Sequence, residues 1–130
     1  MKTNAALQIE REAVQLDGVV ERAAAGCFVV STDRGELDAR RAASCLLEPE
    51  PGDRVALMVL PSGEAFILAV LVREAGAAGR LIHDGDLEIA LPRGGLGVTA
   101  AGDVRVTTRA TVGVVSAGVR VNTVDASVAA

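Results

Sequence analysis

Apolar residues at alternate positions recur along the chain after Asp84. Five pairs follow this pattern: Leu87 and Ile89, Leu96 and Val98, Val104 and Val106, Val112 and Val114, and Val119 and Val121. Consecutive pairs begin seven to nine residues apart, and Gly, Asp, Thr, Ser, Arg and Asn lie between them. Alternation within a pair predicts a strand with one buried face. The nearly constant spacing predicts that one small structural unit is repeated.

Each predicted unit is too short to close a core within one chain, because its strand holds only about three to five residues. We therefore predict a short β-helix or prism in which three copies of the chain are wound together. The ten residues of the five pairs would then form the core of a homotrimer. The alternative is a plain antiparallel meander folded back on the rest of the chain as a monomeric β-sandwich. The repeat lacks two-residue hairpin signals such as Asn-Gly, which counts against the meander.

The preceding part of the chain, residues 16–74, is predicted to be a compact all-β unit. Turn signals separate its apolar runs: Asp33–Gly35 and Pro61–Glu64 favour tight turns, and the two prolines of Glu48–Asp53 exclude a sheet interior. The predicted strands contain Val19–Val20 and span Cys27–Ser31, Glu36–Ala43, Arg54–Leu60 and Ala65–Val72. Five strands with short turns fit a small closed barrel of the oligonucleotide/oligosaccharide-binding (OB) type. Closure would also hide the sheet edges.

The predicted organisation thus has four parts. A polar N-terminal arm covers residues 1–15, and the OB-like barrel covers residues 16–74. Small residues at 75–80 (AGAAGR) are typical of a flexible hinge. The repetitive β-helix region then runs over residues 81–130.

Composition narrows the possible partners. Half of the chain is hydrophobic, yet it holds only two aromatic residues, Phe28 and Phe66, and both are expected in the core. The net charge is −4 without a basic tract, so we expect neither nucleic acid nor an anionic membrane surface as a partner. Membrane insertion is not expected either, because no apolar run approaches the roughly 20 residues that span a bilayer. The N-terminal sequence has charges where a signal peptide needs an apolar stretch. A cytoplasmic location follows as the expectation, with export as part of a larger machine left open.

Few residues offer chemistry. His83 is the only histidine and lies beside Asp84, as in an exposed turn; a triad or metal site needs further convergent groups. Ser44 lacks the nucleophile-elbow pattern, and Gly94–Gly97 lacks the Lys-Ser/Thr of a phosphate loop. Cys27 and Cys45 are expected to be small buried residues, although a disulfide between neighbouring strands stays open. We predict no catalytic residue, no cofactor and no metal, and hence no enzyme.

Two stretches resemble a known protein family. They are Ala39–Val55, with the string A-x-S-C-L-L-x-P-x-x-G-D-x-V, and Ala65–Arg73. Both resemble an uncharacterised bacterial family that is encoded in type VI secretion gene clusters, beside valine-glycine-repeat spike proteins. Spike proteins of this machine place a small β-barrel before a triple-stranded β-helix, and the order of elements here is similar. With only about five repeat units, this region is shorter than a spike needle.

The resemblance implies a structural accessory protein of the spike: a trimeric adaptor, collar or effector-loading component. Its partners would be other copies of itself and the spike, tip or effector-loading proteins. Since the repeat continues to the last residue without a polar cap, Val128, Ala129 and Ala130 are the expected docking end. The alternative function is an OB-type module that binds a glycan or a protein and is oligomerised by its β-rich tail.

Overall fold

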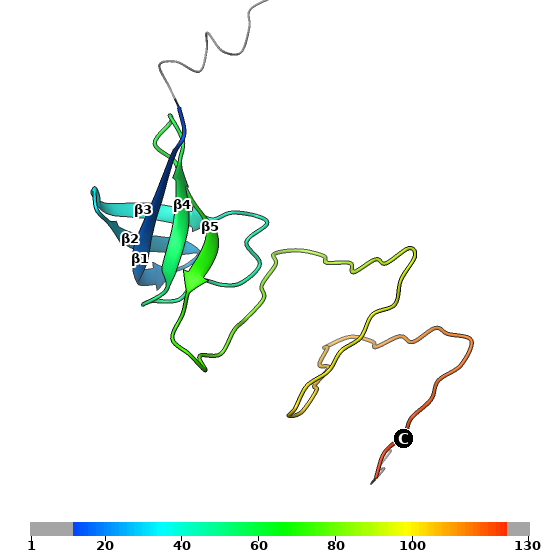
Figure 1. The fold of residues 1–130 in the computed structure, drawn as a ribbon. Helices are drawn as coiled ribbons and strands as arrows, with labels where there is room; N and C mark the ends of the chain where they lie inside the picture. Colours follow the sequence, from blue (N-terminus) through cyan, green and yellow to red (C-terminus); the bar gives the residue numbers. More distant parts are fainter. Residues whose placement is uncertain (1–11, 125–130) are drawn as a thin grey trace, which may run out of the picture. The chain divides into compact units, whose positions relative to one another are not determined.

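The computed structural model of the chain describes residues 12–124. Within them lie five strands and no helix (Figure 1). The strands are β1 (Val14–Ala24), β2 (Cys27–Thr32), β3 (Gly35–Arg41), β4 (Arg54–Val59) and β5 (Ala65–Val72). All five predicted strands are therefore confirmed, although β3 ends two residues before the predicted Ala43, and β1 begins within the predicted N-terminal arm.

The five strands form one mixed sheet that closes into a ring in the order β1-β2-β3-β5-β4. Neighbouring strands are antiparallel except β3 and β5, which run parallel and pair only through Arg40↔Phe66 and Arg41↔Ile67. The all-β prediction and the closure of the first unit are confirmed. We refer to this unit below as the closed sheet.

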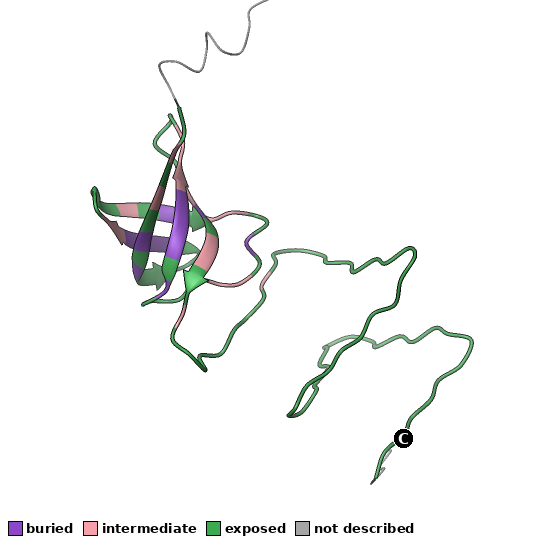
Figure 2. Cartoon of the chain, in the orientation of Figure 1, coloured by how far each residue is buried: buried purple, intermediate pink, exposed green. Residues whose placement is uncertain are grey.

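Alternation along the strands builds one core inside the ring, as Figure 2 shows by the buried positions along the strands. The buried hydrophobic cluster consists of Val20, Phe28, Val30, Ala39, Cys45, Val55, Leu57, Ala65 and Ile67. The predicted burial of Phe28 is confirmed, since only 4% of it is exposed. The prediction for Phe66 is wrong: it precedes the inward Ile67 on β5, so its ring is only half-buried, and Arg40 lies 5.2 Å from the ring centroid.

Gly18 lets β1 approach β2 closely. It pairs with Thr32 of β2 and with Val55 of β4. A Cβ atom there would lie 2.6 Å from the Ser31 carbonyl oxygen and 2.7 Å from Val30 Cγ1. Only glycine allows the two strands to approach this closely.

The predicted turns are confirmed. Gly35 has φ 102° after the turn at Asp33–Arg34, and Gly63 has φ 94° in the turn between β4 and β5. Positive φ favours glycine at both positions. Residues 48–53 form a loop that contains the buried Pro49.

The chain divides into two compact units, residues 1–89 and residues 90–130. After β5 the only strand-like pairing in the described residues is a single bridge between Leu47 and Leu81. The described part of the repeat region has turns and bends but no strand of its own. In one chain the predicted β-helix therefore has no counterpart, and both the β-helix and the trimer remain predictions. No helix that could cross a membrane occurs in residues 12–124.

Candidate functional site

The repeat region of the single chain exposes many large apolar side chains. All ten residues predicted for the trimer core are exposed, with exposed fractions from 58% for Val112 to 78% for Val106. The ten are Leu87, Ile89, Leu96, Val98, Val104, Val106, Val112, Val114, Val119 and Val121. A soluble chain rarely leaves so many large apolar side chains uncovered, and such surfaces mark association sites.

The described residues of one chain therefore do not form the predicted core. The physical reason is that residues 81–124 form no strand and so bring no second apolar face against their own side chains. In the first pair Leu87 is 64% and Ile89 68% exposed, although both belong to the compact unit of residues 1–89. In the later pairs Val98, Val114 and Val121 are each 71–72% exposed. Their burial between three chains stays a prediction.

The predicted docking end has no structural account. Its three residues, Val128, Ala129 and Ala130, lie outside the described residues.

Within the closed sheet, one ion pair is buried. The guanidinium group of Arg73, just after β5, donates from Nε to Asp53 Oδ1 at 2.9 Å and from Nη2 to Asp53 Oδ2 at 2.6 Å. Only 14% of the Arg73 side chain and 4% of the Asp53 side chain are exposed. Arg73 also donates to the carbonyl oxygens of Glu48 and Ala78, and Asp53 Oδ2 accepts from the amide of Glu50.

These bonds shift both ionisation equilibria toward the charged forms. The hydrogen bonds from Arg73 lower the pKa of the Asp53 carboxyl group, and this effect outweighs its desolvation. The hydrogen bonds to Asp53 raise the pKa of the Arg73 guanidinium group. The pair therefore stays ionised at neutral pH and ties three chain segments together: the loop at Glu48–Asp53, the end of β5 and the segment at Ala78.

A second arginine fixes the segment that leads to the repeat region. Arg41 Nη1, at the end of β3, donates to the carbonyl oxygens of Cys45 at 2.6 Å and Ile82 at 3.0 Å. Backbone bonds add to this anchor: Glu48 donates to the Arg80 carbonyl, and Ile82 donates to the Leu46 carbonyl, each at 2.8 Å. Residues 80–82, which we call the pinned segment, are thus held against residues 45–48. The pinned segment begins where the predicted hinge ends, and the flexibility of the hinge stays a prediction.

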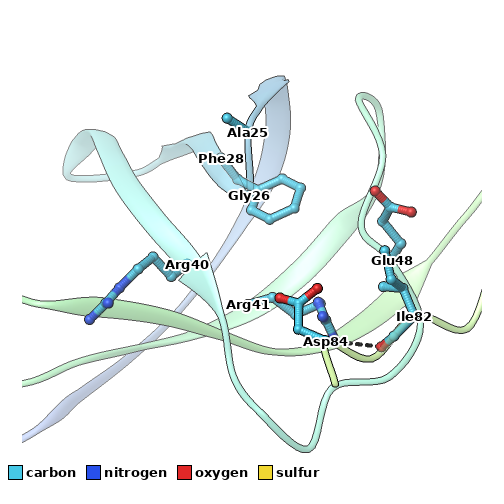
Figure 3. Close-up of a pocket in the computed structure, with 8 residues that line it drawn as sticks. All are labelled: Ala25, Gly26, Phe28, Arg40, Arg41, Glu48, Ile82 and Asp84. Atoms are coloured by element: carbon cyan, nitrogen blue, oxygen red, sulfur yellow. Dashed lines mark hydrogen bonds between the residues drawn. The ribbon is translucent and has the colours of Figure 1, made fainter. Parts of the chain in front are cut away.

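A hollow lies beside the pinned segment. Its volume is about 400 Å³, and Figure 3 shows the residues that line it: Ala25, Gly26, Phe28, Arg40, Arg41, Glu48, Ile82 and Asp84. Arg40 is paired with Glu64 at 2.6 Å, and Glu48 lies 3.6 Å from Arg80. Asp84 has no ion-pair partner among the described residues. The hollow is therefore lined by Phe28, by the small residues Ala25 and Gly26, and by the unpaired carboxyl group of Asp84.

The other residues considered for chemistry lie apart. His83 is exposed and lines a neighbouring hollow with Asp84, and Ser44 is exposed in a turn. Residues Leu91–Gly94 form a turn in which the Gly94 amide donates to the Leu91 carbonyl oxygen at 3.4 Å. Among residues 12–124 there is no cluster of three or more His, Cys, Asp or Glu side chains that could hold a metal ion.

The two cysteines are free, so no disulfide joins them. Cys45 is buried as predicted, and burial raises the pKa of its thiol. The prediction for Cys27 is wrong. It occupies the first position of β2, next to the inward Phe28, and its side chain is exposed.

The sequence contained a partial signal for the buried ion pair. Asp53 follows Gly52 in a proline-rich loop just before β4, and Arg73 directly follows the apolar run of β5. Their positions are 20 residues apart, and the antiparallel β4–β5 hairpin, in which Arg54 pairs with Val72, brings the two residues together at its open end. No feature of the sequence distinguishes Arg41 from the adjacent Arg40, which has the same chemistry but is exposed.

Comparison with known proteins gives one result. No curated protein and no solved structure matches the chain significantly. One family model does match, over residues 18–130, which includes β2 to β5 and the whole repeat region. The chain therefore belongs to the family described as "Protein of unknown function (DUF3540)".

Proposed function

We propose that this protein is a non-enzymatic structural component of a type VI secretion spike and acts as a trimeric adaptor, collar or effector-loading component. The observation that carries the proposal is the exposure of all ten residues of the five apolar pairs. The described part of a single chain leaves them uncovered. Three copies wound together would turn the same face of every unit toward one axis.

Burial of the paired residues would favour association. Each Val or Leu side chain that moves from water into a packed core contributes about 1.5–3 kcal/mol. Each unit offers two such side chains from each of three chains. The backbone entropy lost on ordering the repeat opposes association, so hydrogen bonds between the chains must contribute as well.

The order of parts along this chain supports the same proposal. Spike proteins have a similar order, with a small β-barrel before a β-helix. In its strand order and its single parallel β3–β5 pair, the closed sheet is consistent with a small OB-type barrel. A barrel followed by short Val-rich repeats is the arrangement that the resemblance of Ala39–Val55 and Ala65–Arg73 implies. The partners would be the spike, tip or effector-loading proteins encoded nearby, and the protein would be cytoplasmic before any export with the spike.

Co-expression tests this function. The tagged full chain is produced with the spike, tip and effector-loading proteins of the same gene cluster, and co-purification is measured. We expect capture of at least one of these proteins by the wild-type chain and by Thr107→Asp, and loss of capture by Val106→Asp. Absence of capture by a wild-type protein that is trimeric would contradict the adaptor function.

A second candidate function is suggested by the hollow beside Ile82. Pockets of this size with a few polar groups and an aromatic wall bind small ligands or side chains. The protein would then be an OB-type binding module for a glycan or a protein segment. A glycan array probed with labelled wild-type chain and with Asp84→Ala tests it: specific signals lost in the variant would favour this function over the adaptor.

A further inference from the structure

The guanidinium group of Arg41 has hydrogen-bond donors that the described residues do not use. A guanidinium group has five N–H donors. The two on Nη1 donate to the carbonyl oxygens of Cys45 and Ile82, and those on Nε and Nη2 have no acceptor in the part of the chain that the structure describes. Arg41 is half-buried and lines the hollow of about 400 Å³ beside the pinned segment. Water or a bound molecule must therefore supply the missing acceptors.

Unused acceptors lie in the same hollow. The Asp84 carboxylate makes neither a hydrogen bond nor an ion pair with the described residues. Asp84 and Arg41 together line both this hollow and a neighbouring one of about 350 Å³. Glu48 lines the first hollow as well, and its carboxylate lies 3.6 Å from the exposed Arg80. The hollow thus places unused donors and unused acceptors on one wall system.

These groups select a neutral ligand that is rich in hydroxyl groups. An anion would be repelled by the carboxylates of Glu48 and Asp84, and a cation by Arg41. A hydroxyl group both donates and accepts, so neighbouring hydroxyls of a sugar bond to a guanidinium group and to carboxylates at once, whereas a peptide amide offers fewer groups. Phe28 and Ile82 supply apolar wall for the C–H face of a sugar ring (Figure 3). The volume is within the range of small-ligand sites.

We propose that this hollow binds a neutral sugar and that the bound sugar holds the pinned segment against the closed sheet. The second effect follows from the origin of the walls. Gly26, Phe28 and Arg41 belong to the closed sheet and its turns, whereas Ile82 and Asp84 lie in the segment that leads to the repeat region. A molecule that binds only when both walls are in place stabilises that arrangement. This inference rests on the second candidate function, whose ligand it names, and does not depend on the trimer.

Sugar titration of the full chain tests the site. Glucose, galactose, mannose and N-acetylglucosamine are added separately at millimolar concentrations, and ligand-observed NMR measures the dissociation constant. Asp84→Asn removes the unpaired charge, and the matched control is Asp86→Asn, at an exposed position that lines neither hollow. We expect at least one sugar to bind the wild type and Asp86→Asn equally, and to bind Asp84→Asn about tenfold more weakly or worse.

The same samples report on the pinned segment. At a sugar concentration about ten times the dissociation constant, trypsin cleavage after Arg80 should be about tenfold slower, and cleavage after Arg105 in the repeat region should not change. Equal affinity of Asp84→Asn and the wild type, or binding without protection of Arg80, would overturn the proposal. Binding of N-acetylglutamine amide but of no sugar would overturn it too, while the second candidate function would stand for a protein segment. Failure of all these probes would refute that function as well.

Discussion

At the scale of single residues, the buried pair Asp53–Arg73 is the most constrained feature of the closed sheet. Its carboxylate accepts two hydrogen bonds from Arg73 and one from the Glu50 amide. Hydrogen bonds to charged groups are among the stronger ones in proteins, and an unpaired charge in a buried position is costly. Three ion pairs made by residues of the strands, Arg22–Glu36, Arg40–Glu64 and Asp17–Arg54, have side chains that are more than half exposed and contribute little.

This contrast gives a matched pair of variants. Asp53→Asn keeps the shape of the side chain but removes its charge, so we expect the free energy of unfolding to fall by about 1.5–3 kcal/mol. Asp17→Asn should change it by no more than about 0.5 kcal/mol. Urea unfolding of both variants and the wild type measures the difference. Equal effects of the two substitutions would refute the dominant role of the buried pair.

The pH dependence follows from the lowered pKa of Asp53. A carboxyl group whose pKa is lower in the folded protein stabilises the fold above its unfolded pKa of about 3.9 and loses this contribution as the pH falls through its folded pKa. We therefore expect wild-type stability from this group to be constant from about pH 8 to about pH 5 and to decline below about pH 4. Asp53→Asn should show a smaller decline in acid; an unchanged acid profile would contradict the assignment.

At the scale of elements, two neighbouring arginines of β3 are expected to differ. Arg41 holds the carbonyl oxygens of Cys45 and Ile82, whereas Arg40 makes an exposed pair with Glu64. Arg41→Met should free the pinned segment and raise the rate of trypsin cleavage after Arg80 several-fold. Arg40→Met should not. Limited proteolysis followed by mass spectrometry identifies the cut, and equal rates in the two variants would show that Arg41 does not hold the segment.

The repeat region is expected to have an inside and an outside. Val106→Asp would place three carboxylates near one axis, where burying unpaired charge is prohibitive. Thr107, the next residue, should face the solvent in the β-helix, because successive side chains of a strand point to opposite faces. We expect Val106→Asp to abolish the trimer and Thr107→Asp to leave it intact, as judged by light scattering. Identical behaviour would refute the inside-outside assignment.

Element positions were predictable from the sequence where local signals agree. The strands β2, β4 and β5 lie within one residue of their predicted ranges, because alternation and turn glycines mark both ends. Phe66 and Cys27 were not predictable, since each is an apolar residue on the outward side of a strand whose other face is buried. The Asp53–Arg73 anchor follows from the β4–β5 hairpin, whereas Arg41 bonds to the Ile82 carbonyl 41 residues away, a contact that no local signal predicts.

At the scale of the whole molecule, the charge and the placement of aromatics oppose binding to single-stranded nucleic acid. The net charge is −4, Phe28 is buried, and Phe66 is half-buried beneath Arg40. Such binding needs a basic groove and aromatic rings on which bases stack. A low-salt gel shift with single-stranded oligonucleotides should be negative. A salt-sensitive complex at micromolar protein would contradict this and favour the OB-type binding function.

The central claim is that three chains complete a structure that one chain leaves open, and the mass in solution tests it most directly. The chain has a mass of 13.3 kDa, so the trimer should measure about 40 kDa. We expect this mass from size-exclusion chromatography with multi-angle light scattering of the wild-type protein at micromolar concentration. A single species of 13.3 kDa under these conditions would contradict the account.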